Sequence, residues 1–251
     1  MKTRTRRIGN FGNLVKNYVR ARTEYPLEVF DYLRKLKKGK KLLALDLGCG
    51  TGISTRQLAR LFETVGCDKD PIMLRYARKS RNPGVKNYVR ASADHLPFTN
   101  ETFDIVSAFS AFHWFDDRRS VMEIKRILKP GGLLFVANKT GVVRWGEGYR
   151  KAIIKSTGRH IAAFKENSYN PVKTLRWYGF RNVKMKHWNR SEFYTLQKAL
   201  QYVQSVSIWN SVPGALRLRA LDGVRSYFKK VRADTGKIER KMNIRAVSGA
   251  K

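Results

Sequence analysis

A glycine-rich loop and an acidic residue that follows it have the residue types and spacing that point most directly to chemistry. The loop is the sequence DLGCGTG at residues 46–52, which ends one apolar run and leads into a helical stretch. Glycine lacks a Cβ atom and tolerates positive φ, so the backbone there can approach a flat, polar ligand. Asp68 ends the next apolar run, where its carboxylate can accept hydrogen bonds from the two hydroxyls of a ribose. Together they predict a site for a nucleoside-containing ligand.

This loop differs from the fingerprint of dinucleotide-binding folds. That fingerprint would have a third glycine or an alanine at position 53, where this chain has Ile53, and the ligand's pyrophosphate would lie on the following helix. The spacing therefore disfavours a dinucleotide. The four histidines and two cysteines show no spacing typical of zinc ligands, so we expect no metal.

A second group of candidate residues follows the fourth apolar run of the core. His113 and Trp114 lie in the sequence SAFHWFD at residues 110–116, and open α/β sheets bind ligands at the carboxyl ends of their strands. A neutral histidine can remove a proton from a hydroxyl, an amine or a carbon acid. His113 is therefore the best candidate base. The alternative, with about equal weight, is that it hydrogen-bonds the backbone and only shapes a pocket.

The elements that must position these residues follow a regular alternation. Short apolar runs alternate with helical stretches from residue 41 onward, which is typical of βαβ units and a parallel sheet. We expect Ser54 to cap the helix after the glycine loop, and Asp116 or Asp117 to cap a later one. A turn at residues 130–132 should precede the fifth strand. The predicted strands of the core are residues 41–47, 64–67, 85–90, 103–108 and 133–137.

The chain on either side of this core extends the same domain. Residues 1–40 should form an N-terminal lid with helices, residues 41–140 the cofactor-binding core, and residues 141–251 the substrate-side helices and the last two strands. No internal repeat, low-complexity tract or linker marks a second unit, so we expect a single domain over 1–251. The predicted helices of these flanks are 26–36, 149–156, 171–178, 195–206 and 216–231, with extended segments at 182–188 and 237–246.

The charge of the chain is strongly positive and unevenly distributed. Lys and Arg number 52 against 19 Asp and Glu, a net charge of +33. The net charge is +10 for residues 1–41, +5 for 42–140 and +18 for 141–251. Such a field would attract anions such as RNA, an acidic carrier protein or a carboxylated small molecule, although it could also be only a solvated basic surface.

Composition also predicts where the protein acts. The two cysteines, Cys49 and Cys67, both lie in the core and fit a reducing compartment better than a disulfide framework. The basic N-terminus lacks the apolar stretch of a secretory signal, and no apolar run is long enough to span a bilayer. We expect a cytoplasmic protein without a membrane partner, and nothing in the sequence indicates its oligomeric state.

Over residues 14–140 the chain resembles the class I S-adenosylmethionine-dependent methyltransferases, in particular the type 11 family. The resemblance rests on LDLGCGTG at residues 45–52, on Asp68 and on LKPGG at residues 128–132. It implies S-adenosylmethionine as the cofactor. It also implies an α/β, Rossmann-like doubly wound fold, with a mostly parallel seven-stranded sheet, helices on both faces and an N-terminal helical lid.

The same resemblance implies which residues hold the cofactor. The glycine loop would face the methionyl end, Asp68 the ribose, and Asp94 the amino group of the adenine. Asp46 would act indirectly by holding the loop, and Asp94 could instead simply cap a turn. The expected cofactor-binding residues are Tyr18, Asp46, Gly48, Cys49, Gly50, Thr51, Gly52, Asp68, Lys69, Met73, Ala93, Asp94 and Ser110.

The N-terminal segment YVRARTEYP at residues 18–26 is similar to the lid of trans-aconitate methyltransferase-like proteins, with Thr23 where that pattern has proline. By this resemblance, Tyr18 and Arg22 would close on the cofactor. Arg22 could also pair with a carboxylate of the acceptor, because arginine binds carboxylates bidentately. The expected substrate-binding residues are Arg22, His113 and Trp114, and the expected catalytic residues are His113 and Arg22.

The sequence therefore predicts a methyltransferase that acts on a small, anionic or carboxylated acceptor. An RNA methyltransferase, or an enzyme that methylates a carboxylate on an acidic carrier protein, would also use the basic flanks. A further alternative is a non-catalytic module that binds cofactor or RNA, because a fold does not by itself establish an activity.

Overall fold

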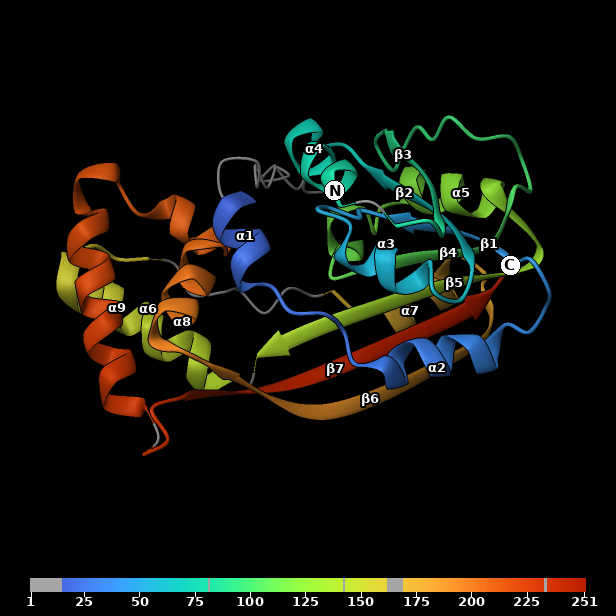
Figure 1. The fold of residues 1–251 in the computed structure, drawn as a ribbon. Helices are drawn as coiled ribbons and strands as arrows, with labels where there is room; N and C mark the ends of the chain where they lie inside the picture. The colour runs from blue at the N-terminus through green and yellow to red at the C-terminus, as the bar shows by residue number, and fades with distance from the viewer. Residues whose placement is uncertain (1–14, 81, 142, 162–168, 233) are drawn as a thin grey trace.

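The computed structural model describes residues 15–80, 82–141, 143–161, 169–232 and 234–251 (Figure 1). Its strands are β1 (Leu43–Leu47), β2 (Glu63–Asp68), β3 (Val85–Arg90), β4 (Phe103–Phe109), β5 (Leu128–Gly141), β6 (Arg181–Tyr194) and β7 (Ile238–Ala250). Its helices are α1 (Val15–Ala21), α2 (Leu27–Leu36), α3 (Ile53–Leu58), α4 (Pro71–Lys79), α5 (Arg118–Ile127), α6 (Val143–Thr157), α7 (Pro171–Trp177), α8 (Leu196–Gln204) and α9 (Arg217–Val231). Short 3-10 helices are η2 (Phe112–Trp114), η3 (Ser207–Ser211) and η4 (Gly214–Leu216).

The strands form one seven-stranded sheet in the order β3-β2-β1-β4-β5-β7-β6. β1 to β5 pair in parallel, and β7 is antiparallel to both of its neighbours. The predicted mostly parallel, Rossmann-like sheet is therefore confirmed. Because β1 and β4 are central, the loops after them meet at the carboxyl edge of the sheet, where open α/β folds bind ligands.

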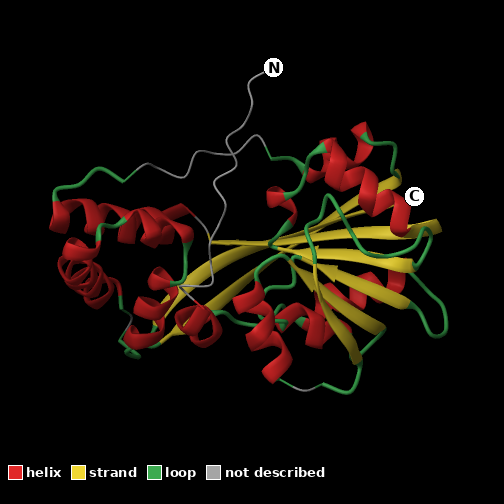
Figure 2. Cartoon of the chain, turned by 90° about the horizontal axis from the view of Figure 1, so that it is seen from above, coloured by secondary structure: helices red, strands yellow, loops and turns green. Residues whose placement is uncertain are grey.

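Alternating side chains of the central strands bury both faces of the sheet. Ala44 packs with the α2 residues Phe30 and Leu33 on one face, in a cluster that also contains Leu58 of α3. Its neighbour Leu45 packs on the other face, with α5 and α7. Figure 2 shows helices on both sides of the fanned strands. This arrangement fixes the strand ends rigidly because each strand is packed on two sides.

A second lobe of helices lies beside the sheet, at the left of Figure 1. It contains α6, α8 and α9, and α1 packs against α8. Its own core includes Tyr149, Tyr202, Val203, Val224 and Phe228. The long strands β5, β6 and β7 run from the sheet toward this lobe, so the ends of these strands lie between the two halves of the molecule (Figure 1).

Two local predictions at helix starts are resolved by the structure. Ser54 does not cap the helix after the glycine loop, because α3 begins at Ile53 and Gly52 is its N-cap. The Ser54 hydroxyl instead donates to Asp46 at 2.7 Å, since a buried carboxylate needs hydrogen-bond donors. Asp117 is the acid that caps α5, by accepting a hydrogen bond from the Ser120 amide.

The predicted turn at residues 130–132 lies within β5 and not before it. β5 begins at Leu128, and its pairing with β4 shifts between Phe103 and Ile105. Gly131 adopts a φ of 67°, which only glycine adopts readily, so the turn sequence becomes an irregularity inside the strand. β6 and β7 are also longer than the predicted segments, because their antiparallel pairing continues past the sheet toward the helical lobe.

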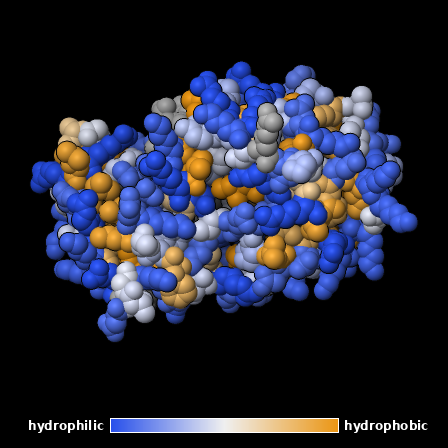
Figure 3. Space-filling view, viewed as in Figure 1, coloured by the Kyte–Doolittle hydropathy of each residue, from blue (hydrophilic) through white to orange (hydrophobic). Residues whose placement is uncertain are grey.

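The surface seen in Figure 3 is mostly hydrophilic, with hydrophobic residues in separate patches. Across the described parts of the chain, no helix combines the length and apolar character that crossing a bilayer needs.

Candidate functional site

The glycine loop between β1 and α3 has a backbone path that requires glycine. Gly48 and Gly52 have φ values of 73° and 76°. A Cβ atom on Gly48 would lie 2.6 Å from the Cβ of Ala111, and one on Gly52 would lie 2.5 Å from the Tyr88 hydroxyl. The Gly48 amide donates to the Cys67 carbonyl at 2.7 Å, which ties the loop to the end of β2.

Asp46 holds this loop from beneath. Its Oδ2 accepts hydrogen bonds from the hydroxyls of Ser54 and Thr55, both at 2.7 Å, and Oδ1 accepts a longer one from Ser107 at 3.4 Å. Burial raises the pKa of Asp46 to about 6, although these hydroxyls oppose the shift. The carboxylate therefore joins β1, α3 and β4.

Asp68 lies at the end of β2, next to the loop. Its Oδ2 accepts a hydrogen bond from the Gly50 amide at 2.8 Å and its Oδ1 accepts one from the Asp70 amide at 2.9 Å. Burial raises its pKa and these two amides oppose the rise. An ionised carboxylate has about four lone-pair sites, so both oxygens can still accept hydrogen bonds from hydroxyls of a ligand.

The residues expected around an adenine lie beyond the ends of β2 and β3, which are neighbours in the sheet. Met73 of α4 and Ala93 are buried, whereas Lys69 is exposed. Asp94 is half-buried and accepts a short hydrogen bond from the Ser92 hydroxyl. The Ala91 amide donates to the Asp68 carbonyl at 3.2 Å, which holds this segment against the end of β2.

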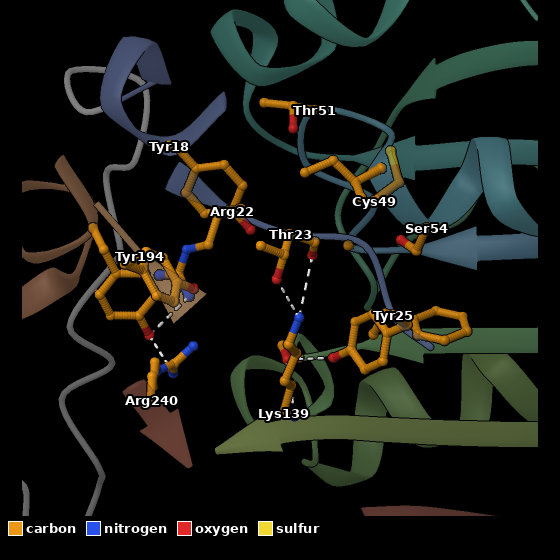
Figure 4. Close-up of a pocket in the computed structure, with 15 residues that line it drawn as sticks. Tyr18, Arg22, Thr23, Tyr25, Cys49, Thr51, Ser54, Lys139, Tyr194 and Arg240 are labelled. Carbon is orange, nitrogen blue, oxygen red and sulfur yellow. Dashed lines mark hydrogen bonds between the residues drawn. The ribbon is translucent and has the colours of Figure 1, made fainter. Parts of the chain in front are cut away.

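A pocket of about 590 Å³, including the space at its mouth, opens between the glycine loop and the helical lobe (Figure 4). It brings together six of the predicted site residues, which are Tyr18, Arg22, Gly48, Cys49, Thr51 and Ser110. The other lining residues are Thr23, Tyr25, Ile53, Ser54, Phe109, Lys139, Tyr194, Tyr202 and Arg240. The lining therefore includes three cations and four tyrosines.

Arg22 is a largely buried cation whose partners are tyrosines. Its guanidinium lies over the Tyr18 ring at 4.9 Å and over the Tyr202 ring at 4.8 Å. Its Nη1 donates to the Tyr202 hydroxyl at 3.4 Å, and its buried Nε has no hydrogen-bond partner in the part of the chain that the structure describes. Among the described residues, no carboxylate forms an ion pair with Arg22. A desolvated cation in this position favours an anion supplied by a ligand.

The other two cations share one carboxylate. Glu192 forms an ion pair with Lys139 at 2.5 Å and another with Arg240 at 3.3 Å. The hydroxyls of Thr23 and Tyr194 also donate to it. Burial alone would raise the pKa of Glu192, but the Lys139 ammonium and the hydrogen bonds from Thr23 and Tyr194 together lower it. Glu192 is therefore ionised, and it joins β5, β6 and β7 to the segment that follows α1.

Ser110 and Tyr25 close the pocket on the side of the sheet. The two hydroxyls are 2.6 Å apart, and the Ser110 hydroxyl also accepts a hydrogen bond from the Lys139 amide at 3.3 Å. Ser110 has a φ of 52°, in the left-handed region. Burial raises the pKa of Tyr25, so its hydroxyl stays protonated.

His113 and Trp114 are not among the lining residues of this pocket. They lie in η2, and the His113 ring packs against Trp114 at 4.8 Å and Tyr169 at 5.8 Å. Burial lowers the pKa of His113 to about 4, so the imidazole is neutral near pH 7. The Tyr169 hydroxyl in turn accepts a hydrogen bond from Asn138.

Sequence reasoning missed several charged and aromatic residues of the pocket. Lys139 had a readable signal, because it follows the predicted fifth strand at the ligand-binding edge. Tyr202 and Arg240 had none, and neither had Glu192, which pairs with two of the lining cations, because these residues come from α8, β7 and β6 and meet only through the tertiary fold.

The loop fits the cofactor that the sequence resemblance implies. A Cβ atom on Gly50 would meet no atom within 4 Å, so the space beside the loop is open. The Thr51 hydroxyl is buried without a hydrogen-bond partner among the described residues, and Asp68 offers acceptor sites beside it. Open space, an orphaned donor and a carboxylate suit a polar nucleoside ligand.

Comparisons of sequence agree with this geometry. The chain matches the family described as methyltransferase domain over residues 45–136. An uncharacterized methyltransferase of Mycobacterium tuberculosis is 29% identical over 217 residues, which cover 86% of this chain and 84% of that protein. An uncharacterized methyltransferase of Bacillus subtilis is 42% identical over 142 residues, 55% of this chain and 60% of that protein.

Comparisons of structure show the same fold. YcgJ of Bacillus subtilis has a TM-score of 0.57 at 18% identity and covers 90% of this chain and 99% of its own. Phosphoethanolamine N-methyltransferase 2 of Haemonchus contortus, solved with phosphomonomethylethanolamine and S-adenosylhomocysteine, has a TM-score of 0.54 at 16% identity, over 96% of this chain and 57% of its own. With its glycine loop, its acidic strand end and these relatives, the chain carries a methyltransferase domain at residues 45–136, and it is an S-adenosylmethionine-dependent methyltransferase with a Rossmann-like fold.

Proposed function

We propose that this enzyme methylates a small acceptor that carries a carboxylate or another anionic group, and that the acceptor binds in the pocket beside Tyr18 and Arg22. The observation that carries the proposal is the Arg22 guanidinium, which is largely buried among tyrosines and has no carboxylate partner among the described residues. Leaving a charge desolvated and unpaired is costly, and an acceptor anion would offset that cost. The lining contains three cations, and their positive charge also favours an acceptor that is negatively charged.

Roles for the cofactor-side residues follow from their positions. Asp68 would accept the ribose hydroxyls, Met73 and Ala93 would contact the adenine, and the loop from Gly48 to Gly52 would face the methionyl end. S-adenosylmethionine supplies an electrophilic methyl group on a sulfonium. The chain's own contribution is then to hold the acceptor atom in line with that group, because proximity and orientation supply most of the acceleration in such a transfer.

A base is needed only for some acceptors. A carboxylate oxygen carries no proton to remove, so Arg22 could orient it without further help. A hydroxyl, amine or carbon acid would benefit from a neutral histidine, and the lowered pKa of His113 keeps its imidazole neutral. We therefore assign Arg22 to acceptor binding. Because His113 does not line this pocket, we assign it proton removal only for an acceptor that has a proton to lose and extends beyond the pocket lining to η2.

We further infer that the two lobes act as one domain, because β5, β6 and β7 contribute to the sheet and to the pocket alike. A cytoplasmic location is consistent with the two buried, free cysteines.

The test is methyl transfer from labelled S-adenosylmethionine to a panel of carboxylated metabolites, with Arg22→Met as the decisive variant. Removing a charge-assisted pairing should lower kcat/KM on the order of 100-fold. Arg20→Met is the matched control, because Arg20 lies exposed on α1, two residues before Arg22, and its replacement should leave kcat/KM unchanged. Calorimetric binding of S-adenosylhomocysteine to wild type and Asp68→Ala would establish separately that the cofactor site works.

Two results would overturn the proposal. Methyl incorporation into RNA or an acidic carrier protein, with none into any carboxylated metabolite, would favour the alternatives that use the basic surface. Equal activity of Arg22→Met and wild type on an anionic acceptor would remove Arg22 from acceptor binding.

A further inference from the structure

Glu192 is the carboxylate that lies among the cations of the pocket. Its side chain is 14% exposed, and its partners Lys139 and Arg240 are 10% and 6% exposed. It is held in place from two further sides by the hydroxyls of Thr23 and Tyr194. Charges as buried as these are weakly screened by water and salt, so their sum governs which anions bind nearby.

The three cations Arg22, Lys139 and Arg240 lie close enough to act together on a bound anion, because they share Tyr202 and Glu192 as neighbours. The Tyr202 hydroxyl accepts hydrogen bonds from Arg240 at 2.6 Å and from Arg22 at 3.4 Å, and both guanidiniums lie over its ring. Lys139 joins this group through Glu192. With one carboxylate against three cations, the group has an excess of two positive charges for the anions that bind beside it.

We propose that Glu192 sets how much negative charge the acceptor may carry. This inference rests on the proposed function, since it assumes that an anionic acceptor binds beside Arg22. With Glu192 ionised, the site has an excess of only two positive charges. It therefore binds an acceptor with more negative charge only moderately more tightly than one with less. Removing the carboxylate would leave an excess of three, and each further charge on the acceptor would then bind more tightly.

A purely structural role for Glu192 predicts a different outcome. Its contacts to Thr23 and Lys139 join the segment after α1 to β5, so losing them could loosen the pocket for every ligand alike. Glu192→Gln separates the two roles. The amide keeps the shape and one carbonyl acceptor, but it removes the charge.

The experiment is calorimetric binding of three probes to the protein saturated with S-adenosylhomocysteine. The probes are butanoate, succinate and propane-1,2,3-tricarboxylate, which carry about one, two and three negative charges at neutral pH. Glu192→Gln should raise the preference for succinate over butanoate about 10-fold, and that for the tricarboxylate over succinate by a similar factor. Lys139→Met, which removes a cation, should lower both preferences about 10-fold.

Glu239→Gln is the matched control. Glu239 is an exposed carboxylate on β7 that hydrogen-bonds to Ser191. Its replacement by Gln changes the net charge by the same amount as Glu192→Gln, but it does not alter the group of cations in the pocket. It should leave both preferences within about twofold of wild type, because exposed charges are screened by solvent.

The outcomes separate this inference from the proposed function. If wild type binds the carboxylates through Arg22 but Glu192→Gln changes all three affinities by the same factor, Glu192 is structural and only the inference fails. If wild type binds none of the three probes at millimolar concentration while it still binds S-adenosylhomocysteine, the anionic acceptor itself is wrong.

Discussion

The two sides of the site are built on different physical principles. On the cofactor side, two carboxylates accept hydrogen bonds from groups of the glycine loop and of the helix that follows it. Asp68 accepts one from the Gly50 amide, and Asp46 accepts one from the Ser54 hydroxyl, so the pairing is made within a short stretch of chain. On the side where we propose that the acceptor binds, called the acceptor side below, side chains from α1, β5, β6, β7 and α8 meet across the molecule, and cations outnumber carboxylates. The net charge follows the same division, with +5 in residues 42–140 and +18 in residues 141–251.

The two sides differ in how completely their polar and charged groups are paired within the protein. The cofactor loop is internally hydrogen-bonded and sterically tight, so it contributes to stability as well as to binding. The acceptor side leaves the Arg22 guanidinium without a carboxylate among the described residues, an arrangement that favours a ligand over the stability of the free protein. Substitutions on the two sides should therefore affect stability and binding in different proportions.

Gly48→Ala should have the largest effect on stability. Its Cβ atom would lie 2.6 Å from that of Ala111, at a φ of 73° that alanine adopts at a cost. Strain and overpacking together should lower the free energy of unfolding by about 3 kcal/mol, measured by urea denaturation. Gly50→Ala has a similar φ but nothing within 4 Å, so it should cost only about 1 kcal/mol. Equal losses would mean that packing against Ala111 does not constrain the loop.

Asp46 should make the cofactor side more stable at lower pH. Its folded pKa of about 6 lies above the value near 3.9 of an unfolded chain. The folded state therefore binds more protons between pH 4 and 6, and this group's contribution to stability declines as the pH rises through that window. The unfolding free energy of wild type, relative to Asp46→Asn, should fall by about 2 kcal/mol from pH 4.5 to 7. Denaturation at several pH values measures this difference, and a constant difference would contradict the burial of an ionisable Asp46.

His113 should show the opposite trend in the same window. Burial lowers its folded pKa to about 4, below the unfolded value near 6.5. The folded state then binds fewer protons between these values, so stability declines as the pH falls. Relative to His113→Gln, wild type should lose about 1 to 2 kcal/mol from pH 7 to 4.5, a figure reduced because the ring is partly exposed. A histidine signal in an NMR titration that moves near pH 6.5 would show that His113 is solvated instead.

The sequence was informative for the cofactor side because that side is local. DLGCGTG, Asp68 and the strand alternation lie in short contiguous segments, and periodicity predicted β3 at its observed bounds. The mostly parallel, seven-stranded sheet also followed from the family resemblance. The errors concerned details that packing decides, such as Ser54, whose hydroxyl is drawn to the buried Asp46 and does not cap α3.

The acceptor side was only partly predictable, because its residues are far apart in the chain. Tyr18 and Arg22 were predicted from a resemblance of the lid, and both line the pocket. Glu192 and Arg240 are separated by 48 positions and meet because β6 and β7 pair in antiparallel register. No periodicity in either strand distinguishes a charge that faces a pocket from one that faces solvent. The partial burial of His113 against Tyr169 likewise depends on a contact between distant segments.

Arg22→Met should sharpen the contrast between the two sides by changing binding and not stability. Methionine can keep the packing on Tyr18 and Tyr202. The substitution removes the desolvation cost of the guanidinium, which stabilises the folded state, and it also removes two cation–π contacts, which destabilises the folded state, so the two effects offset each other. The free energy of unfolding should therefore stay within about 1 kcal/mol of wild type. Thermal unfolding with and without S-adenosylhomocysteine measures this. A loss as large as that of Gly48→Ala would show that Arg22 is needed for the fold.

The smallest expected effect concerns the basic surface of the helical lobe. Lys229 and Lys230 end α9 on the helical lobe and are exposed, and replacing both with Glu would lower the local positive potential without touching the lining. Electrostatic steering then predicts that kcat/KM for an anionic acceptor falls about twofold at low salt, with no difference at 0.5 M NaCl. Lys38→Glu with Lys40→Glu makes the same charge change in the segment between α2 and the amino end of β1, where both side chains are exposed. If both double variants lower kcat/KM equally, the field is a property of the whole surface and the acceptor side has no special share in it.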